Sequence, residues 1–110
     1  MYLEEIEQFR QKGSPDEWYI SKLIERSSVL FDSERAFEEI DKMVSTLLSE
    51  KEWDIFLIHC QYILSLARIS GTTEKPTKFT QNLDKVRQKI EALNLVAHNE
   101  VRDLYAWYRI

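Results

Sequence analysis

The chain has 110 residues, of which 44 % are hydrophobic and 31 % charged, and this size and composition fit one compact domain with its own core. Its 19 acidic and 15 basic residues give a net charge of −4, which argues against general binding to nucleic acid or to an anionic membrane. A single cysteine excludes an intramolecular disulfide and the N-terminal residues lack the pattern of a signal peptide, so we expect a cytoplasmic protein.

Glycine and proline, which most often interrupt helices, occur only twice each, in the segments 13–15 and 71–76. Elsewhere apolar residues recur at spacings of three and four, as in amphipathic helices. The sequence therefore predicts an all-α fold, a compact single-domain bundle of five to six antiparallel helices spanning residues 1–110. The expected helices cover about residues 2–12, 15–31, 34–48, 51–69, 77–93 and 95–108.

Capping residues mark the ends of these helices. Gly13 can adopt the left-handed conformation that ends the first helix. Ser14 is expected to cap the second, with Pro15 at its first position and Glu17 closing a capping box. Asp32 offers a side-chain oxygen to the third helix.

Helix 51–69 is expected to begin at a second capping box, formed by Ser49 and Glu52. Because successive helical residues lie about 100° apart, its polar side chains gather in one narrow stripe. The stripe consists of Asp54, Gln61, Ser65 and Arg68. Apolar side chains occupy the rest of the surface, so we expect this helix to be the buried centre of the fold.

The last part of the chain holds a narrow apolar seam in 77–93, a break at Asn94 and a final helix over 95–108. Residues 40–43 and 83–86 resemble each other at an offset of 43, a period in the range of HEAT-type helical repeats. The similarity is confined to period and helix pairing, and two unrelated amphipathic helices would share such a stripe. HEAT-like helix pairs and coincidence both stay open. Segment 71–76 is the one connection with room to be flexible.

His59 and Cys60 are the residues most suggestive of chemistry. Neighbours on a helix point about 100° apart, so the two cannot easily face one metal ion or act as a catalytic pair. We interpret His59 as a core histidine with one or two hydrogen bonds, and Cys60 as a buried, unreactive thiol. The chain carries no phosphate loop, dinucleotide fingerprint or nucleophile turn, so we expect neither catalysis nor a cofactor or metal.

Acidic residues are concentrated in the first half of the chain. Residues 1–55 carry a net charge of −7 and residues 56–110 a net charge of +3. The excess could steer a basic partner or attract the protein's own C-terminal half. The acidic residues proposed to bind a partner are Asp32, Glu34, Glu38, Glu39, Asp41, Glu50, Glu52 and Asp54.

Aromatic residues are the second set of candidate contacts. Trp18 begins the second helix, while Trp107 and Tyr108 lie among the last four residues. Exposed tryptophan and tyrosine are typical anchors of protein interfaces, but for the last helix packing onto the core is the favoured interpretation and interface anchors are the alternative. Lys78, Lys85 and Lys89 share a face, yet without interleaved aromatics they are a weak signature of nucleic-acid binding.

These features favour a non-catalytic protein-binding module with a basic partner. The most concrete version is an immunity or antitoxin-type inhibitor whose acidic face occludes a basic toxin or nuclease, an analogy that rests on size and charge. The alternative is a structural or adaptor protein that self-associates, for instance as a homodimer through its aromatic C-terminus.

Overall fold

The computed structural model describes residues 2–110, which form seven α-helices and no strand. The helices are α1 Tyr2–Lys12, α2 Tyr19–Ser28, α3 Ser33–Ser49, α4 Trp53–Ser70, α5 Thr77–Gln81, α6 Leu83–Ala92 and α7 Asn99–Tyr108. The all-α prediction is confirmed, and the helices form one compact globule with a Cα radius of gyration of 13.2 Å. Within residues 2–110, no helix has the length and hydropathy required to cross a membrane.

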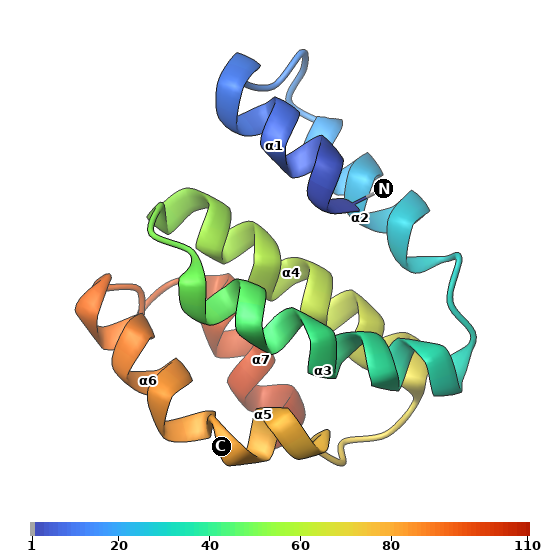
Figure 1. Cartoon of the computed structure of the whole chain (residues 1–110), viewed down its shortest axis with the longest axis vertical. Helices are drawn as coiled ribbons and strands as arrows, with labels where there is room; N and C mark the ends of the chain where they lie inside the picture. The colour runs from blue at the N-terminus through green and yellow to red at the C-terminus, as the bar shows by residue number, and fades with distance from the viewer. Residues whose placement is uncertain (1) are drawn as a thin grey trace.

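Helix α4 is the centre of the fold, as its apolar surface predicted. Eleven of its 18 residues are buried, including every residue from Ile55 to Cys60. Helix α3 runs antiparallel beside α4, and α2 and α7 also pack against it (Figure 1). Neighbouring helices therefore cover most of the apolar surface of α4, and Trp53 at its first position is 55 % exposed.

The remaining helices complete the core from two directions. Helices α1 and α2 form a hairpin on one side of the α3–α4 pair, and α5 and α6 contact α3 on the other (Figure 1). The fully buried side chains include Ile6 of α1, Phe56 of α4, Phe79 of α5 and Leu104 of α7. One continuous apolar core therefore links both ends of the chain.

Helix α2 begins at Tyr19, later than the predicted start at residue 15. The Asp16 carboxylate accepts a hydrogen bond from the backbone N–H of Trp18 at 2.8 Å, whereas the Ser14 hydroxyl donates to the Asp16 carbonyl. Asp16 thus forms the turn into α2, and the capping box expected at Ser14 does not form. At its other end α2 stops at Ser28, whose hydroxyl donates to the Ile24 carbonyl at 2.7 Å.

The turn between α3 and α4 also differs from the prediction. Ser49 is the last residue of α3, and its hydroxyl donates to the Thr46 carbonyl at 3.1 Å. The Glu50 carboxylate accepts the backbone N–H groups of Lys51 and Glu52, both at 3.2 Å. Glu50 therefore organises the turn that Ser49 was expected to cap.

The predicted helix 77–93 is divided at Asn82, which raises the number of helices to seven. The Asn82 side chain donates to the Lys78 carbonyl at 2.8 Å. Such a local side-chain bond competes with regular helix geometry, and Asn82 has a φ of −110°. The two similar segments, 40–43 and 83–86, consequently lie in the middle of α3 and in the first turn of α6. The structure does not confirm HEAT-like pairs.

Left-handed residues follow four helices, including Arg109 after α7 with a φ of 57°, and the sequence predicted this conformation for Gly13. Gly13 follows α1 with a φ of 76°, Gly71 follows α4 with a φ of 71°, and Asn94 lies beyond α6 with a φ of 60°. The connection after Gly71 is fastened to α7, because the indole N–H of Trp107 donates to the Thr72 carbonyl at 3.1 Å. Helix α7 starts at Asn99, after a turn that occupies the residues predicted to begin it.

Candidate functional site

The first group of predicted acidic residues lies along the N-terminal half of α3. Asp32 caps this helix by accepting the backbone N–H of Arg35 at 2.8 Å, and Glu34 and Glu38 are exposed. Asp41 is half-buried and accepts the backbone N–H of Lys78 at 2.9 Å, so it attaches α5 to α3. Glu39 is also half-buried. Asp32, Glu34 and Glu38 are therefore the exposed members of this group.

The second group, at the α3–α4 turn, does not form a free acidic surface. Glu50 is only 6 % exposed, so its prediction as a surface residue is wrong. Arg10 of α1 forms ion pairs with Glu50, at 2.8 Å, and with Glu52. Asp54 is exposed at the start of α4 and accepts the backbone N–H of Ile55 at 2.9 Å. The predicted acidic run is thus interrupted by a neutralised segment.

The three predicted aromatic anchors lie in different environments. Trp18 is 60 % exposed between α1 and α2. Trp107 is half-buried over the connection that follows α4. Tyr108 is 2 % exposed and packs against Phe79, with ring centroids 5.1 Å apart. Tyr108 is a core residue, so its prediction as a surface anchor is wrong, and Trp18 alone of the three presents most of its surface to solvent.

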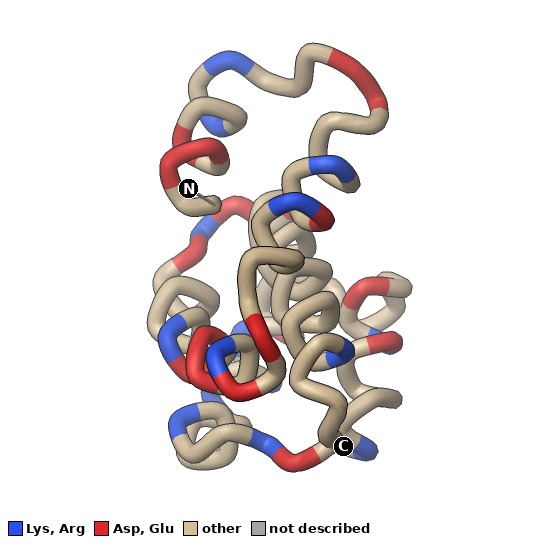
Figure 2. Tube along the Cα trace, turned by 90° about the vertical axis from the view of Figure 1, so that its right-hand side faces the viewer, with Lys and Arg blue, Asp and Glu red and all other residues tan. Residues whose placement is uncertain are grey.

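Charge neutralisation takes place largely within the acidic half of the chain. Arg10 pairs with Glu7, Glu50 and Glu52, and Arg26 pairs with Glu5 at 2.5 Å. Acidic and basic positions are interspersed along the trace in Figure 2. The N-terminal carboxylates are therefore partly neutralised by arginines of the same half, and these ion pairs do not draw the two halves of the chain together.

A chain of hydrogen bonds runs through the core from α1 to the α3–α4 turn. The Tyr2 hydroxyl lies 2.8 Å from His59 Nδ1, and His59 Nε2 lies 3.0 Å from Glu50 Oε1. Arg10 donates two further bonds to Glu50, at 2.8 and 2.9 Å. A neutral imidazole with its proton on Nε2 satisfies both contacts of His59. The prediction of a hydrogen-bonded core histidine is confirmed.

These contacts determine the charge of each group. Burial lowers the pKa of His59 despite the neighbouring Glu50 carboxylate. Burial acts on Glu50 in the opposite direction, but hydrogen bonds from Arg10 and His59 outweigh it and hold the pKa of Glu50 at about 2. Burial also raises the pKa of the Cys60 thiol to about 12. His59 thus has no free ring nitrogen, and Cys60 carries a protonated, buried thiol.

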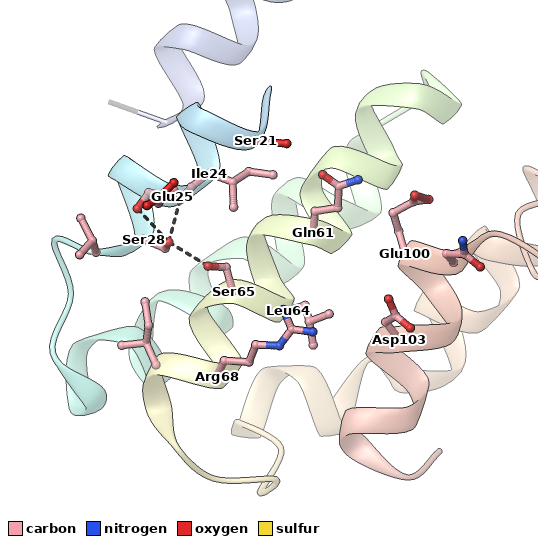
Figure 3. Close-up of a pocket in the computed structure, with 13 residues that line it drawn as sticks. Ser21, Ile24, Glu25, Ser28, Gln61, Leu64, Ser65, Arg68, Glu100 and Asp103 are labelled. Atoms are coloured by element: carbon pink, nitrogen blue, oxygen red, sulfur yellow. Dashed lines mark hydrogen bonds between the residues drawn. The ribbon is translucent and has the colours of Figure 1, made fainter. Parts of the chain in front are cut away.

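A groove of about 540 Å³ lies between α2 and α7 (Figure 3). Its floor is α4, which contributes Gln61, Ser65 and Arg68 from the polar stripe recognised in the sequence. The Ser65 hydroxyl donates to the Ser28 hydroxyl at 2.8 Å and ties α4 to α2 (Figure 3). The apolar side chain of Leu64 also lines the groove.

The groove is acidic on both walls. Glu25 lines it from α2, and Glu100 and Asp103 line it from α7 (Figure 3). Arg68 is the basic residue of the lining. The ion pairs found within residues 2–110 involve none of these four side chains. The groove therefore holds three carboxylates and one guanidinium, all available to a bound molecule.

The groove could be predicted from the sequence only in small part. The polar stripe on α4 contributes three residues to the floor, but from the sequence it predicted only that α4 would be buried. Glu100 and Asp103 are three residues apart and so share one face of α7. Neither feature indicates that α2 and α7 flank the stripe, and Glu25, Glu100 and Asp103 were not predicted as site residues.

Comparisons with known proteins leave the groove as the principal guide to function. No protein-family model matches the chain, and neither a curated protein nor a solved structure matches it. Within residues 2–110, no three His, Cys, Asp or Glu side chains are arranged to hold a metal ion.

Proposed function

We propose that this chain is a non-catalytic protein-binding module that holds a basic segment of its partner in the groove between α2 and α7. The observation that carries the proposal is the set of unpaired carboxylates on both walls, Glu25 opposite Glu100 and Asp103. A lysine or arginine between these walls would exchange water for charge-assisted hydrogen bonds. Ile24 and Leu64 supply apolar contact to the stems of such side chains.

The size of the groove supports a peptide segment as the occupant. Its volume of about 540 Å³ lies within the ~300–1,000 Å³ typical of sites for compact ligands. Arg68 adds one positive charge to the floor, so an acidic residue or a backbone carbonyl of the partner has a donor there. A segment with two or more basic residues around such a group fits this charge pattern.

The acidic residues of α3 have a separate part in this proposal. Asp32, Glu34 and Glu38 are exposed and would attract a basic partner over longer distances, which raises association rates. The concrete version is an immunity or antitoxin-type inhibitor that occludes a basic toxin or nuclease. The occupied ring nitrogens of His59 support a non-catalytic role. The single, buried Cys60 suits a reducing compartment such as the cytoplasm.

The proposal is tested by comparative capture from the host lysate with three immobilised proteins. The first is the wild type, the second is Glu25→Lys/Asp103→Lys, and the third is Glu17→Lys/Glu74→Lys. The third variant makes the same charge change at exposed residues outside the groove. A basic protein should be retained by the wild type and the third variant, with at least a tenfold lower affinity for the second.

Circular dichroism of each variant ensures that a loss of binding is not a loss of fold. Equal retention of the captured protein by all three variants would exclude the groove as its binding site. Capture of acidic proteins alone would contradict the basic partner.

Self-association is a second candidate function, favoured by one observation. Val29 and Leu30, consecutive residues after α2, are 69 % and 63 % exposed. Adjacent exposed apolar side chains are common in interfaces, including those between identical chains. The two candidates differ in oligomeric state and in salt dependence.

A further inference from the structure

A second cavity, which we call the Ser27 pocket, lies where the end of α2 meets α1, α3 and α4. Its volume is about 220 Å³. Helices α1 to α4 and the connection between α2 and α3 all contribute to its lining. The lining residues are Tyr2, Leu3, Glu4, Ser27, Leu30, Phe31, Glu39, Met43 and Tyr62. The volume is below that of sites for drug-sized ligands and suits a single side chain.

The walls of the pocket are apolar and aromatic. Tyr2 and Tyr62 stack with ring centroids 3.9 Å apart and an interplanar angle of 7°. Met43 is 3 % exposed, whereas Leu3 and Leu30 are 49 % and 63 % exposed. Leu3 and Leu30 therefore present apolar surface to solvent, and a bound aromatic ring would cover part of it.

Ser27 adds a buried hydroxyl group to this apolar pocket. Its residue is 2 % exposed, and its hydroxyl has no hydrogen-bond partner within residues 2–110. The neighbouring Ser28, by contrast, donates to the Ile24 carbonyl at 2.7 Å. A buried hydroxyl without a partner is unfavourable, and a ligand that supplies a hydrogen bond recovers that loss.

We propose that the Ser27 pocket receives one tyrosine side chain from a protein partner, with the phenol hydrogen-bonded to Ser27. Glu39 lines the same pocket, so basic residues next to that tyrosine have a carboxylate to contact. Val29 lines the groove and Leu30 lines the pocket, so one partner can reach both across two consecutive residues. The inference rests on the proposed function only in taking the phenol to belong to a protein.

Methionine methyl resonances give a direct measurement of binding. The chain has two methionines, Met1 and Met43, and Met43 lines the pocket. We titrate 4-methylphenol and toluene, which have similar shapes and differ in the hydroxyl, into protein labelled at the methionine methyl groups. The expected result is a saturable shift of the Met43 signal, with 4-methylphenol binding at least fivefold more tightly than toluene.

Ser27→Ala should reduce the affinity for 4-methylphenol to that for toluene. Ser21→Ala is the matched control, because Ser21 is an exposed serine of the same helix that lines the groove, and its affinities should equal those of the wild type. If the wild type binds 4-methylphenol and toluene with equal affinity, the proposal is overturned, and this comparison does not depend on any variant. An unshifted Met43 signal, as expected if only water occupies the pocket, would also overturn it.

Two short peptides test the charge that accompanies the aromatic side chain. Acetyl-Lys-Tyr-Lys-amide should shift the Met43 signal at a lower concentration than acetyl-Glu-Tyr-Glu-amide, and the reverse order would contradict the part assigned to Glu39. The groove variant Glu25→Lys/Asp103→Lys should bind 4-methylphenol as the wild type does. Failure of the pocket and failure of the groove therefore give separate results.

Discussion

The Glu50 carboxylate accepts hydrogen bonds from the Arg10 guanidinium, from His59 and from two backbone N–H groups of the α3–α4 turn. Both oxygens of this buried group are thus fully hydrogen-bonded, which is the condition under which a buried charge is tolerated. The same carboxylate accepts the Nε2–H of the neutral His59 ring. The two residues therefore make the folded state sensitive to acid.

Stability should decrease as the pH falls below about 6.5. Unfolded His59 takes up a proton near its ordinary pKa of 6.5, whereas burial lowers the pKa in the folded protein, so the unfolded state binds more protons. The slope attributable to this residue is at most about 1.4 kcal/mol per pH unit. Glu50 adds a second loss below its ordinary pKa of 4.5, because its folded pKa is about 2.

Urea unfolding at pH 7.5, 6.0 and 5.0 measures this dependence. His59→Gln should be less stable at pH 7.5 and show a flatter dependence between these values. His98→Gln is the comparison variant, since it removes the other histidine, which lies at the start of α7 outside the hydrogen-bonded chain, and the flattening should be larger in His59→Gln. Equal slopes in all three proteins would assign the acid sensitivity to other groups.

Glu50 also shows where sequence reasoning at the residue scale ends. Its position in an acidic, helix-capping segment is typical of a surface residue, and Arg10 is 40 residues away in the chain. No local pattern in the sequence indicates that the guanidinium of Arg10 in α1 binds Glu50. His59 was predicted as a core residue because its place on an apolar helix is local information.

At the scale of elements, α4 and its neighbours also combine features that the local sequence predicts with features that depend on distant parts of the chain. The apolar surface around a narrow polar stripe predicted the burial of α4, because it follows from the 3.6-residue period. That the stripe borders an open groove was not predicted. Which helices form the walls of the groove depends on the topology of the chain, and helical periodicity alone does not predict that topology. Helix ends fall between these cases, because Ser14 and Asp16 are both good capping residues two positions apart.

The start of α2 gives a test of that local competition. Asp16→Ala should destabilise the protein by about 0.5–1 kcal/mol, the usual net cost of a lost hydrogen bond, because it removes the bond to Trp18 in the turn before α2. Ser14→Ala should cost less than about 0.5 kcal/mol. Urea unfolding of the two single variants measures both values. A larger loss for Ser14→Ala would make Ser14 the cap after all.

At the scale of the whole molecule, the surface combines a groove with free carboxylates and a separate apolar pocket. The net charge of −4 opposes association of like copies at low salt, and the groove is complementary to a basic partner. These features favour binding of a different protein over self-association.

We therefore expect a monomer of 13.2 kDa in light scattering, both at low salt and in 1 M NaCl. High salt screens the repulsion between acidic copies, so it is the more demanding condition for this prediction. A dimer in both salts that becomes monomeric on Leu30→Glu would support the self-association candidate and place its interface at the end of α2.

The position of Glu50 in the α3–α4 turn also bears on the order in which the chain assembles. Helices α3 and α4 are adjacent in sequence and pack along one another, so their pairing closes a short loop. The Glu50 carboxylate reaches the position in which it binds Arg10 only after that turn has formed, because the backbone N–H groups of Lys51 and Glu52 hold it there. We therefore expect α1 to dock late, onto a preformed helical hairpin, and to detach first when the protein unfolds.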